Sequence, residues 1–228
     1  MSQRDTLSPG QIVDLLSREY GRPRSRPHRD ATAELVLTVL SQNTSDTNSG
    51  RAFDRLVGTF PDWQAVINAD VRRLEETIQP GGLAPTKAPR IQAMLAEVWR
   101  RRDSFDLSFL AELPLEEARA WLRGLPGVGP KTAACVLLFS LGQPALPVDT
   151  HVHRVAQRLG LVPSKASAEK SHDLLEARLE PEEVYPFHIA LVTHGRRTCM
   201  AQRPRCPSCV LRHGCPSAAR FYPDTTPA

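Results

Sequence analysis

The chain has 228 residues, enough to bury a sizeable core in one large domain or two small ones. Its formal net charge is +4 and its pI about 9.0, a mild bias towards polyanions that carries little weight by itself. No apolar run approaches the ~20 residues of a membrane span, and Met1–Ser8 lacks a signal-peptide core. We therefore exclude a membrane or secreted protein and expect a cytoplasmic one.

The hydrophobic pattern predicts helices along the chain and no convincing strand, so we expect an all-α fold. Asp30 is expected to cap a helix containing Leu35–Leu40, which runs into the polar segment Ser41–Asp46. Further helices are expected over Gly50–Val57, Asp62–Ala69, Asp70–Ile78, Lys87–Arg102 with Pro89 in its first turn, Leu115–Arg123, Lys131–Leu141, Asp149–Leu159 with Gly160 as C-cap, Ala168–Leu179 and Tyr185–Gly195. The chain is expected to cross between two lobes at Arg22–Pro27 and Gly142–Pro147.

A glycine hairpin precedes the most apolar of these helices, in the sequence Leu-Pro-Gly-Val-Gly-Pro-Lys that begins at Leu125. Gly127 and Gly129 allow a sharp turn and let a ligand approach backbone N–H groups, which at a helix N-terminus bind anions. Leu125 and Val128 can pack inward and fix the loop. A simple tight turn is the alternative, but these neighbours favour a helix-hairpin-helix that holds DNA through backbone amides, without sequence preference.

Lys131 follows this hairpin directly, in the first turn of the apolar helix. The helix dipole and partial desolvation both disfavour the ammonium form there, and a neutral amine could attack a sugar C1′ and form a Schiff base. A phosphate-contacting lysine is the alternative. Asp149, in Val-Asp-Thr-His, can cap its own helix and also accept a proton or stabilise an oxocarbenium-like sugar, so it favours the catalytic interpretation.

Four cysteines near the C-terminus form a C-x6-C-x2-C-x5-C array: Cys199, Cys206, Cys209 and Cys215. The compact, asymmetric spacing favours an iron–sulfur cluster over zinc, whose ligands usually come as two separated pairs, and a disulfide is a weaker third interpretation. Cys135 lies apart on the apolar helix and is expected in the core. Between Val184 and Tyr222 there is no Asp or Glu, and Arg203 and Arg205 lie in the loop that the first two cysteines delimit.

These motifs together resemble the endonuclease III family of DNA glycosylases, within the helix-hairpin-helix superfamily. The resemblance covers nearly the whole chain: Leu-Pro-Gly-Val-Gly-x-Lys-Thr-Ala from Leu125, Val-Asp-Thr-His-x-x-Arg-Val around Asp149, His-Gly-Arg from His194, and the four-cysteine array. It implies a two-lobed, all-α fold. One lobe would be a six-helix, barrel-like domain over residues 24–143 that contains the hairpin. The other would combine residues 1–23 and 144–228 and carry a [4Fe–4S] cluster on the four cysteines.

The resemblance also implies roles for single residues. Lys131 would be the Schiff-base nucleophile and Asp149 its partner, with the damaged base flipped out of the duplex. The family usually has a glutamine where this chain has Asn43, and often an aromatic residue where it has Ala84, so lesion preference is expected to differ. Leu83 matches the family's apolar wedge, its alternative being an ordinary loop leucine. DNA contacts are expected from Gln42, Asn43, Leu83, Gly127, Val128, Gly129, His151, Arg203 and Arg205.

The expected function is that of a bifunctional DNA glycosylase and abasic-site lyase that excises oxidised pyrimidines in base excision repair. The alternatives are a mismatch glycosylase acting on thymine, uracil or adenine, and a non-catalytic protein that binds DNA structure. Lys131 and Asp149 argue against the latter. The expected partner is double-stranded DNA with damaged bases or abasic sites, bound by a monomer that associates with a bacterial nucleoid.

Overall fold

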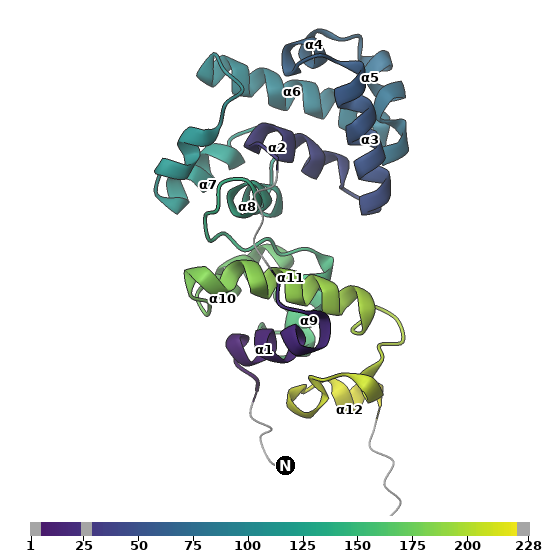
Figure 1. Cartoon of the computed structure of the whole chain (residues 1–228), viewed down its shortest axis with the longest axis vertical. Coiled ribbons are helices and arrows are strands. Elements are labelled where there is room, and N and C mark those ends of the chain that lie inside the picture. The colour runs from purple at the N-terminus through teal and green to yellow at the C-terminus, as the bar shows by residue number, and fades with distance from the viewer. Residues whose placement is uncertain (1–5, 24–28, 223–228) are drawn as a thin grey trace, which may run out of the picture. The chain divides into compact units, whose positions relative to one another are not determined.

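A computed structural model describes residues 6–23 and 29–222, and within these ranges the chain is helical without a strand (Figure 1). This confirms the expected all-α fold class. The longer helices are α1 (Pro9–Tyr20), α2 (Ala31–Leu40), α3 (Asp46–Thr59), α4 (Trp63–Asn68), α5 (Val71–Ile78), α6 (Ala84–Arg102), α7 (Leu115–Arg123), α8 (Pro130–Phe139), α9 (Thr150–Arg158), α10 (Ala168–Glu176) and α11 (Pro181–Arg197). Short elements are η1 (Gln79–Gly81), η2 (Ser108–Glu112), η3 (Cys206–Ser208), η4 (Arg212–Gly214) and α12 (Ala218–Phe221). No helix in the described ranges is long and apolar enough to cross a membrane.

The chain divides into two compact units. The first combines Met1–Arg26 with Pro144–Ala228 and contains α1 and α9 to α12, and the second is Pro27–Gln143 with α2 to α8. Residues 24–28, which include most of the expected crossing Arg22–Pro27 and the expected domain start at Arg24, lie outside the described residues.

Two apolar helices, α2 and α8, form the centre of the second unit and pack against each other. All residues from Thr132 to Leu138 of α8 are buried, among them Cys135, as expected for a core position. In α2 only Leu37 escapes full burial. Because such helices have no polar face, they are stable only with neighbours on most sides, and α3, α6 and α7 supply them.

Aspartate caps begin three helices of this unit: the sequence predicts the cap at Asp30 and helices that start at Asp62 and Asp70. The Asp30 Oδ1 atom accepts hydrogen bonds from two backbone N–H groups, those of Thr32 and Ala33. Asp70 likewise accepts two at the start of α5, and Asp62 accepts one at the start of α4. A capping carboxylate satisfies N–H groups that have no partner within the helix, which makes these starts local and readable from sequence.

Several helix bounds differ from the sequence prediction. Ser45 caps α3, so this helix begins at Asp46 instead of Gly50. Helix α6 begins at Ala84, with Pro85 in its first turn, and Pro89 therefore lies inside the helix. A Glu180–Glu183 capping box starts α11 at Pro181, four residues early, whereas α8 and α10 end two and three residues short.

In the first unit, α11 packs against both α1 and α9. A Cβ atom built on Gly195 of α11 would lie 2.9 Å from the Cβ atom of His151 on α9, closer than real side chains approach. Gly195 therefore permits the contact between the helix that precedes the cysteine loop and the helix that Asp149 caps.

Candidate functional site

The glycine hairpin between α7 and α8 is fixed by burial on one side and by a close contact on the other. Leu125 and Val128 are 3% and 7% exposed, which confirms that they pack inward. Gly127 has a positive φ of +75°, and a Cβ atom there would lie 2.5 Å from Cδ of Arg90. This glycine is required both by its backbone conformation and by the arginine packed against it.

Gly129, by contrast, is open. It is the N-cap of α8 with a φ of −92°, a conformation that other residues adopt, and no atom lies within 4 Å of the position of a Cβ atom. In the described chain, the backbone N–H groups of Gly127 and Gly129 donate no hydrogen bond. The hairpin thus presents unpaired N–H donors and unobstructed space at a helix N-terminus, the requirements of an anion site.

Lys131 is the second residue of α8 and is half-buried beside this space. Its side chain makes no hydrogen bond or ion pair with any other residue that the structure describes. It lies in the second unit and Asp149 in the first, so the expected catalytic pairing of the two stays a prediction.

Asp149 is half-buried and caps α9 with one oxygen only. Oδ1 accepts hydrogen bonds from the His151 and Val152 N–H groups at 2.9 and 2.7 Å. Oδ2 accepts none from the described residues, so capping leaves one carboxylate oxygen available for chemistry. The backbone before Asp149 is held by buried histidines: His172 donates from Nδ1 to the Leu146 carbonyl at 2.8 Å, and His188 donates likewise to Pro147 at 2.9 Å.

His151, an expected DNA contact, is partly engaged within its own unit. Its Nδ1 atom lies 3.2 Å from Nη2 of Arg154. Because a guanidinium only donates hydrogen bonds, Nδ1 is the acceptor and the ring proton lies on Nε2. Arg154 also donates to the carbonyl oxygens of Gly195 and Cys199, so it joins the start of α9 to the start of the cysteine loop.

Two loops of the second unit carry three more of the expected DNA contacts. Asn43 and Leu83 both adopt left-handed backbone conformations with φ of 52°, and both are exposed, Leu83 to 55%. A non-glycine residue in this region is strained, more for leucine than for asparagine, and such strain is often associated with function. Gln42 is half-buried, and its Oε1 atom accepts a hydrogen bond of 2.8 Å from Arg90.

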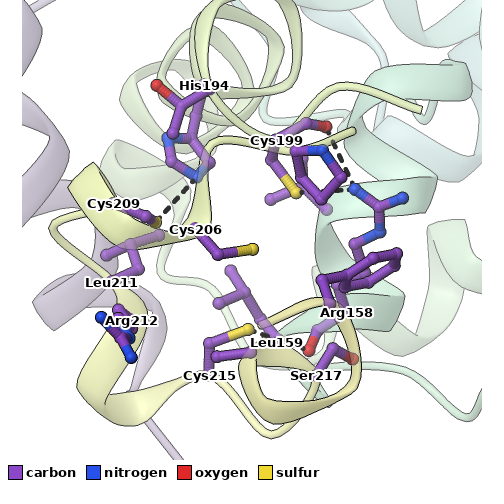
Figure 2. Close-up of a pocket in the computed structure, with 15 residues that line it drawn as sticks. Arg158, Leu159, His194, Cys199, Cys206, Cys209, Leu211, Arg212, Cys215 and Ser217 are labelled. Atoms are coloured by element: carbon purple, nitrogen blue, oxygen red, sulfur yellow. Dashed lines mark hydrogen bonds between the residues drawn. The ribbon is translucent and has the colours of Figure 1, made fainter. Parts of the chain in front are cut away.

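The four cysteines of the C-terminal array line one cavity in the first unit, and Figure 2 shows their sulfur atoms around a common space. Most of the remaining lining is apolar, including Leu159, Leu211 and Phe221. No two cysteines form a disulfide in the described chain. Burial raises the pKa of the Cys209 thiol to about 11, and burial also raises the pKa of Cys206 and of Cys215.

Two side chains place nitrogen atoms within hydrogen-bond distance of these sulfurs. Nη1 of Arg158 lies 3.3 Å from Sγ of Cys199, and Nε2 of His194 lies 3.6 Å from Sγ of Cys209 (Figure 2). Burial lowers the pKa of His194 to about 4, so the ring is neutral at pH 7. Convergent cysteine sulfurs with nitrogen atoms around them, an arrangement typical of metal sites, are therefore assembled here.

Four cysteine side chains around one cavity are a donor set that an iron–sulfur cluster takes. Among the described residues, no three Cys, His, Asp or Glu side chains converge as ligands of one metal ion. A cubane cluster binds one cysteine at each of its four irons, so its cysteines surround a space without meeting at a point. The arrangement around the cavity meets that requirement, and the apolar lining would keep water from it.

The loop between Cys199 and Cys206 faces solvent with its basic residues. Arg203 and Arg205 are both exposed, and Arg203 has a left-handed φ of 49°. The N–H group of Arg205 donates to the Thr198 carbonyl at 2.9 Å, which closes the loop. Both guanidinium groups are thus presented from a short, closed segment.

Sequence reasoning missed several residues that hold these parts in place: Lys87, Arg90, Arg154, Arg158, His172 and His188. Their partners are mostly backbone carbonyls distant in sequence, so no local pattern indicates them. Arg154 and Arg158, four residues apart on the helix after Asp149, are the pair whose spacing could have been noticed.

Comparisons with known proteins show the family to which the chain belongs. The HhH-GPD superfamily of base excision DNA repair proteins matches residues 36–181. A candidate DNA glycosylase from Arabidopsis thaliana is 39% identical over 193 residues, 85% of this chain and 63% of that protein, so the chain spans less than two thirds of that relative. Endonuclease III from Thermotoga maritima is 34% identical over 210 residues, which cover 90% of this chain and 92% of that enzyme.

A solved structure of a non-covalent endonuclease III–DNA complex superposes with a TM-score of 0.80 at 31% identity, covering 94% of this chain and 98% of the other. The fold and the hairpin thus define a helix-hairpin-helix base excision repair protein. Within that class, the chain belongs to the endonuclease III family of DNA glycosylases. The resemblance inferred from the motifs is confirmed.

Proposed function

We propose that this protein is a bifunctional DNA glycosylase and abasic-site lyase that removes oxidised pyrimidines from duplex DNA. One observation carries the proposal: a lysine, Lys131, follows a hairpin whose glycine, Gly129, leaves open space at a helix N-terminus. A phosphate bound at that N-terminus would bring a neighbouring sugar within reach of the lysine amine. Family membership supports the reaction class, since related enzymes are named as endonuclease III.

In the first step the Lys131 amine attacks C1′ of the damaged nucleoside. The new bond joins Nζ to C1′, the glycosidic bond breaks, and the base leaves with its electron pair and takes up a proton. Asp149, through the oxygen that does not cap α9, accepts the amine proton and stabilises the positive charge on the sugar. The nitrogen lone pair then expels O4′ from C1′, O4′ takes up a proton as the sugar ring opens, and the product is a Schiff base between Lys131 and the opened sugar.

The lyase step then breaks the strand. Loss of a proton from C2′ of the Schiff base expels the 3′ phosphate by β-elimination, which breaks the C3′–O bond on the 3′ side of the lesion. Hydrolysis of the Schiff base by water returns the Lys131 amine. No oxidant or reductant is consumed in this sequence, so the chain needs no external electron donor.

The remaining residues are assigned to DNA binding. The N–H groups of Gly127, Val128 and Gly129 border the phosphate site. Leu83, exposed on a strained loop, is placed to enter the gap left by the flipped nucleotide. The other contacts are assigned to Gln42, Asn43, His151, Arg203 and Arg205. We expect the protein to bind as a monomer.

Borohydride trapping tests this function directly, because reduction turns the Schiff base into a stable covalent complex. The wild type should trap on duplexes that contain thymine glycol or an abasic site. Lys131→Ala should abolish trapping, whereas Lys165→Ala, which removes an exposed lysine, should not. Trapping by Lys131→Ala would contradict the assignment. Release of thymine, uracil or adenine from a mismatch by wild type that never traps would instead identify a monofunctional glycosylase.

We further propose that Cys199, Cys206, Cys209 and Cys215 hold a [4Fe–4S] cluster, which makes the first unit the cluster-bearing domain. When bound, the cluster would supply a rigid crosslink that fixes both ends of the Arg203–Arg205 loop. The convergent sulfurs, their hydrogen-bond donors and the apolar lining support this proposal.

Purified protein should be yellow-brown and contain about four iron atoms per chain, as the cluster formula requires. Cys206→Ser should lose the colour. Cys135→Ser is the matched control, since Cys135 is buried in the second unit, and it should keep the colour. Colourless wild type with stoichiometric zinc would overturn the cluster.

A further inference from the structure

Arg90, on α6, contacts two of the loops to which DNA binding is assigned. Its Nη1 atom donates a hydrogen bond of 2.8 Å to Oε1 of Gln42, in the loop after α2. Its Cγ and Cδ atoms lie 2.7 and 2.5 Å from the position that a Cβ atom of Gly127 would take. The aliphatic part of the side chain therefore packs on the hairpin backbone. One arginine thus spans the polar loop and the hairpin.

This contact fixes which way the Gln42 amide points. Arginine has hydrogen-bond donors and no acceptor, so only the amide oxygen of Gln42 can face it. The amide nitrogen, Nε2, makes no hydrogen bond to any described residue, although the side chain is half-buried. The Arg90 contact therefore occupies the acceptor oxygen of Gln42 and leaves its N–H2 group without a partner among the described residues.

A second contact keeps the same loop in register. Nζ of Lys87, one helical turn before Arg90, donates to the carbonyl oxygens of Leu40 and Gly81 at 2.6 and 2.8 Å. Leu40 ends α2 immediately before the polar loop, and Gly81 precedes Leu83. The loop that carries Gln42 is thereby tied to the loop that carries Leu83, and both are tied to α6.

We infer that Arg90 is a positioning residue that makes Gln42 a donor-only reader of the base opposite the lesion. The inference rests on the proposed function, because it requires a duplex whose damaged nucleotide is extruded. When Leu83 occupies that gap, the base left unpaired presents its ring nitrogens and carbonyl oxygens. An amide restricted to donating would recognise an acceptor atom on that base and would gain nothing from a donor there.

The test uses equilibrium binding to duplexes that contain a tetrahydrofuran abasic analogue, which cannot form a Schiff base. The base opposite the analogue is adenine, or 1-deaza-, 3-deaza- or 7-deazaadenine, each of which lacks one acceptor nitrogen. One hydrogen bond is worth about fivefold in affinity. We therefore expect one of the three replacements to weaken binding by wild type about fivefold relative to adenine.

Gln42→Leu and Arg90→Met should each lose this dependence, so that all four duplexes bind within about twofold of one another. The double variant should show no further loss, because Arg90 acts through Gln42. Arg90→Lys, which keeps a donor for the Gln42 oxygen, should restore part of the dependence. Arg100→Met should retain it fully, since Arg100 lies on the same helix, is exposed and pairs with Glu97.

Gln42→Glu provides a test that does not weaken the clamp, because its carboxylate pairs with Arg90 while lacking an N–H2 group. It should also lose the dependence on the acceptor nitrogen, with its melting temperature unchanged or raised. The inference is overturned if no deaza replacement affects binding by wild type. It is also overturned if the effect of a deaza replacement persists in Gln42→Glu or in Arg90→Met, as it would if Arg90→Met weakened binding to all four duplexes by the same factor. Borohydride trapping by wild type reports separately on the proposed function, so a failure of either can be recognised.

Discussion

The Lys87 ammonium group donates a hydrogen bond of 2.6 Å to the carbonyl oxygen of Leu40, the last residue of α2. Lys87 is only 2% exposed, and its second bond goes to the Gly81 carbonyl. The two carbonyls belong to segments that continue into Gln42 and Leu83. A buried ammonium group therefore joins two loops that are distant in the sequence, through one hydrogen bond to a carbonyl oxygen at each.

Lys87→Met should fill the same volume but leave both carbonyl oxygens without a donor. We expect the free energy of unfolding to fall by about 1–3 kcal/mol, measured by urea denaturation. Lys165→Met, at an exposed lysine, should change it by less than about 0.5 kcal/mol. A Lys87→Met protein as stable as wild type would mean that the carbonyls do not depend on the lysine.

The difference in stability between wild type and Lys87→Met should change with pH. Burial lowers the pKa of Lys87 from its ordinary 10.5, so the unfolded chain binds more protons than the folded protein just below that value. Stability rises with pH wherever the unfolded state binds more protons. Wild type should therefore gain stability relative to Lys87→Met as the pH rises towards 10.5, and a constant difference would contradict the desolvated lysine.

Substitutions at the two hairpin glycines should have different effects on stability and on DNA affinity. Gly129→Ala adds a methyl group into open space at an ordinary φ, so stability should change by less than about 0.5 kcal/mol. Its DNA affinity should fall by roughly tenfold, because the methyl group obstructs a phosphate at the α8 N-terminus. Gly127→Ala, with its positive φ and its contact to Arg90, should instead destabilise the fold by about 1–2 kcal/mol. Unchanged DNA affinity for Gly129→Ala would exclude this anion site.

How far the sequence predicts the structure depends on how local each interaction is. Asp30 is predictable as a cap, and Asp70 as the start of a helix, because a carboxylate bonds N–H groups two or three residues away. Helix α6 begins at Ala84, before the expected start at Lys87, because the left-handed conformation extends past Gly82 to Leu83, a residue type that does not indicate it. With the expected helix start at Lys87, nothing in the pattern indicated that this side chain is buried.

The same distinction between local and distant interactions applies to the candidate site. The hairpin, Lys131 and the four cysteines were identified from spacing, since each is a short segment with its chemistry in sequence. The hydrogen bonds of Arg90 to Gln42 and of Arg158 to Cys199 join residues 48 and 41 positions apart. Such contacts depend on how helices pack, which no periodicity in the chain reports.

Gly195→Ala should disturb the contact between α9 and α11. A methyl group there would lie 2.9 Å from the His151 Cβ atom, and because both helices are packed, we expect a loss of about 1–3 kcal/mol in stability. Gly58→Ala is the matched control: Gly58 lies within α3, and nothing lies within 4 Å of a Cβ atom at that position. That variant should be more stable by about 0.4–1 kcal/mol. Equal melting temperatures for the two would show that α9 can move away without cost.

Arg205→Met should weaken DNA binding without altering what the protein recognises. Arg205 is exposed on the loop between two cysteines, and a phosphate contact carries no sequence information. The slope of log affinity against log salt concentration should become shallower by about 1, since one fewer counterion is released on binding. Arg100→Met removes the same charge from α6, where Arg100 pairs with Glu97, and should leave the slope unchanged. If the effect of Arg205→Met depended on the base opposite the lesion, or vanished at low salt, the arginine would be reading the base instead of the backbone.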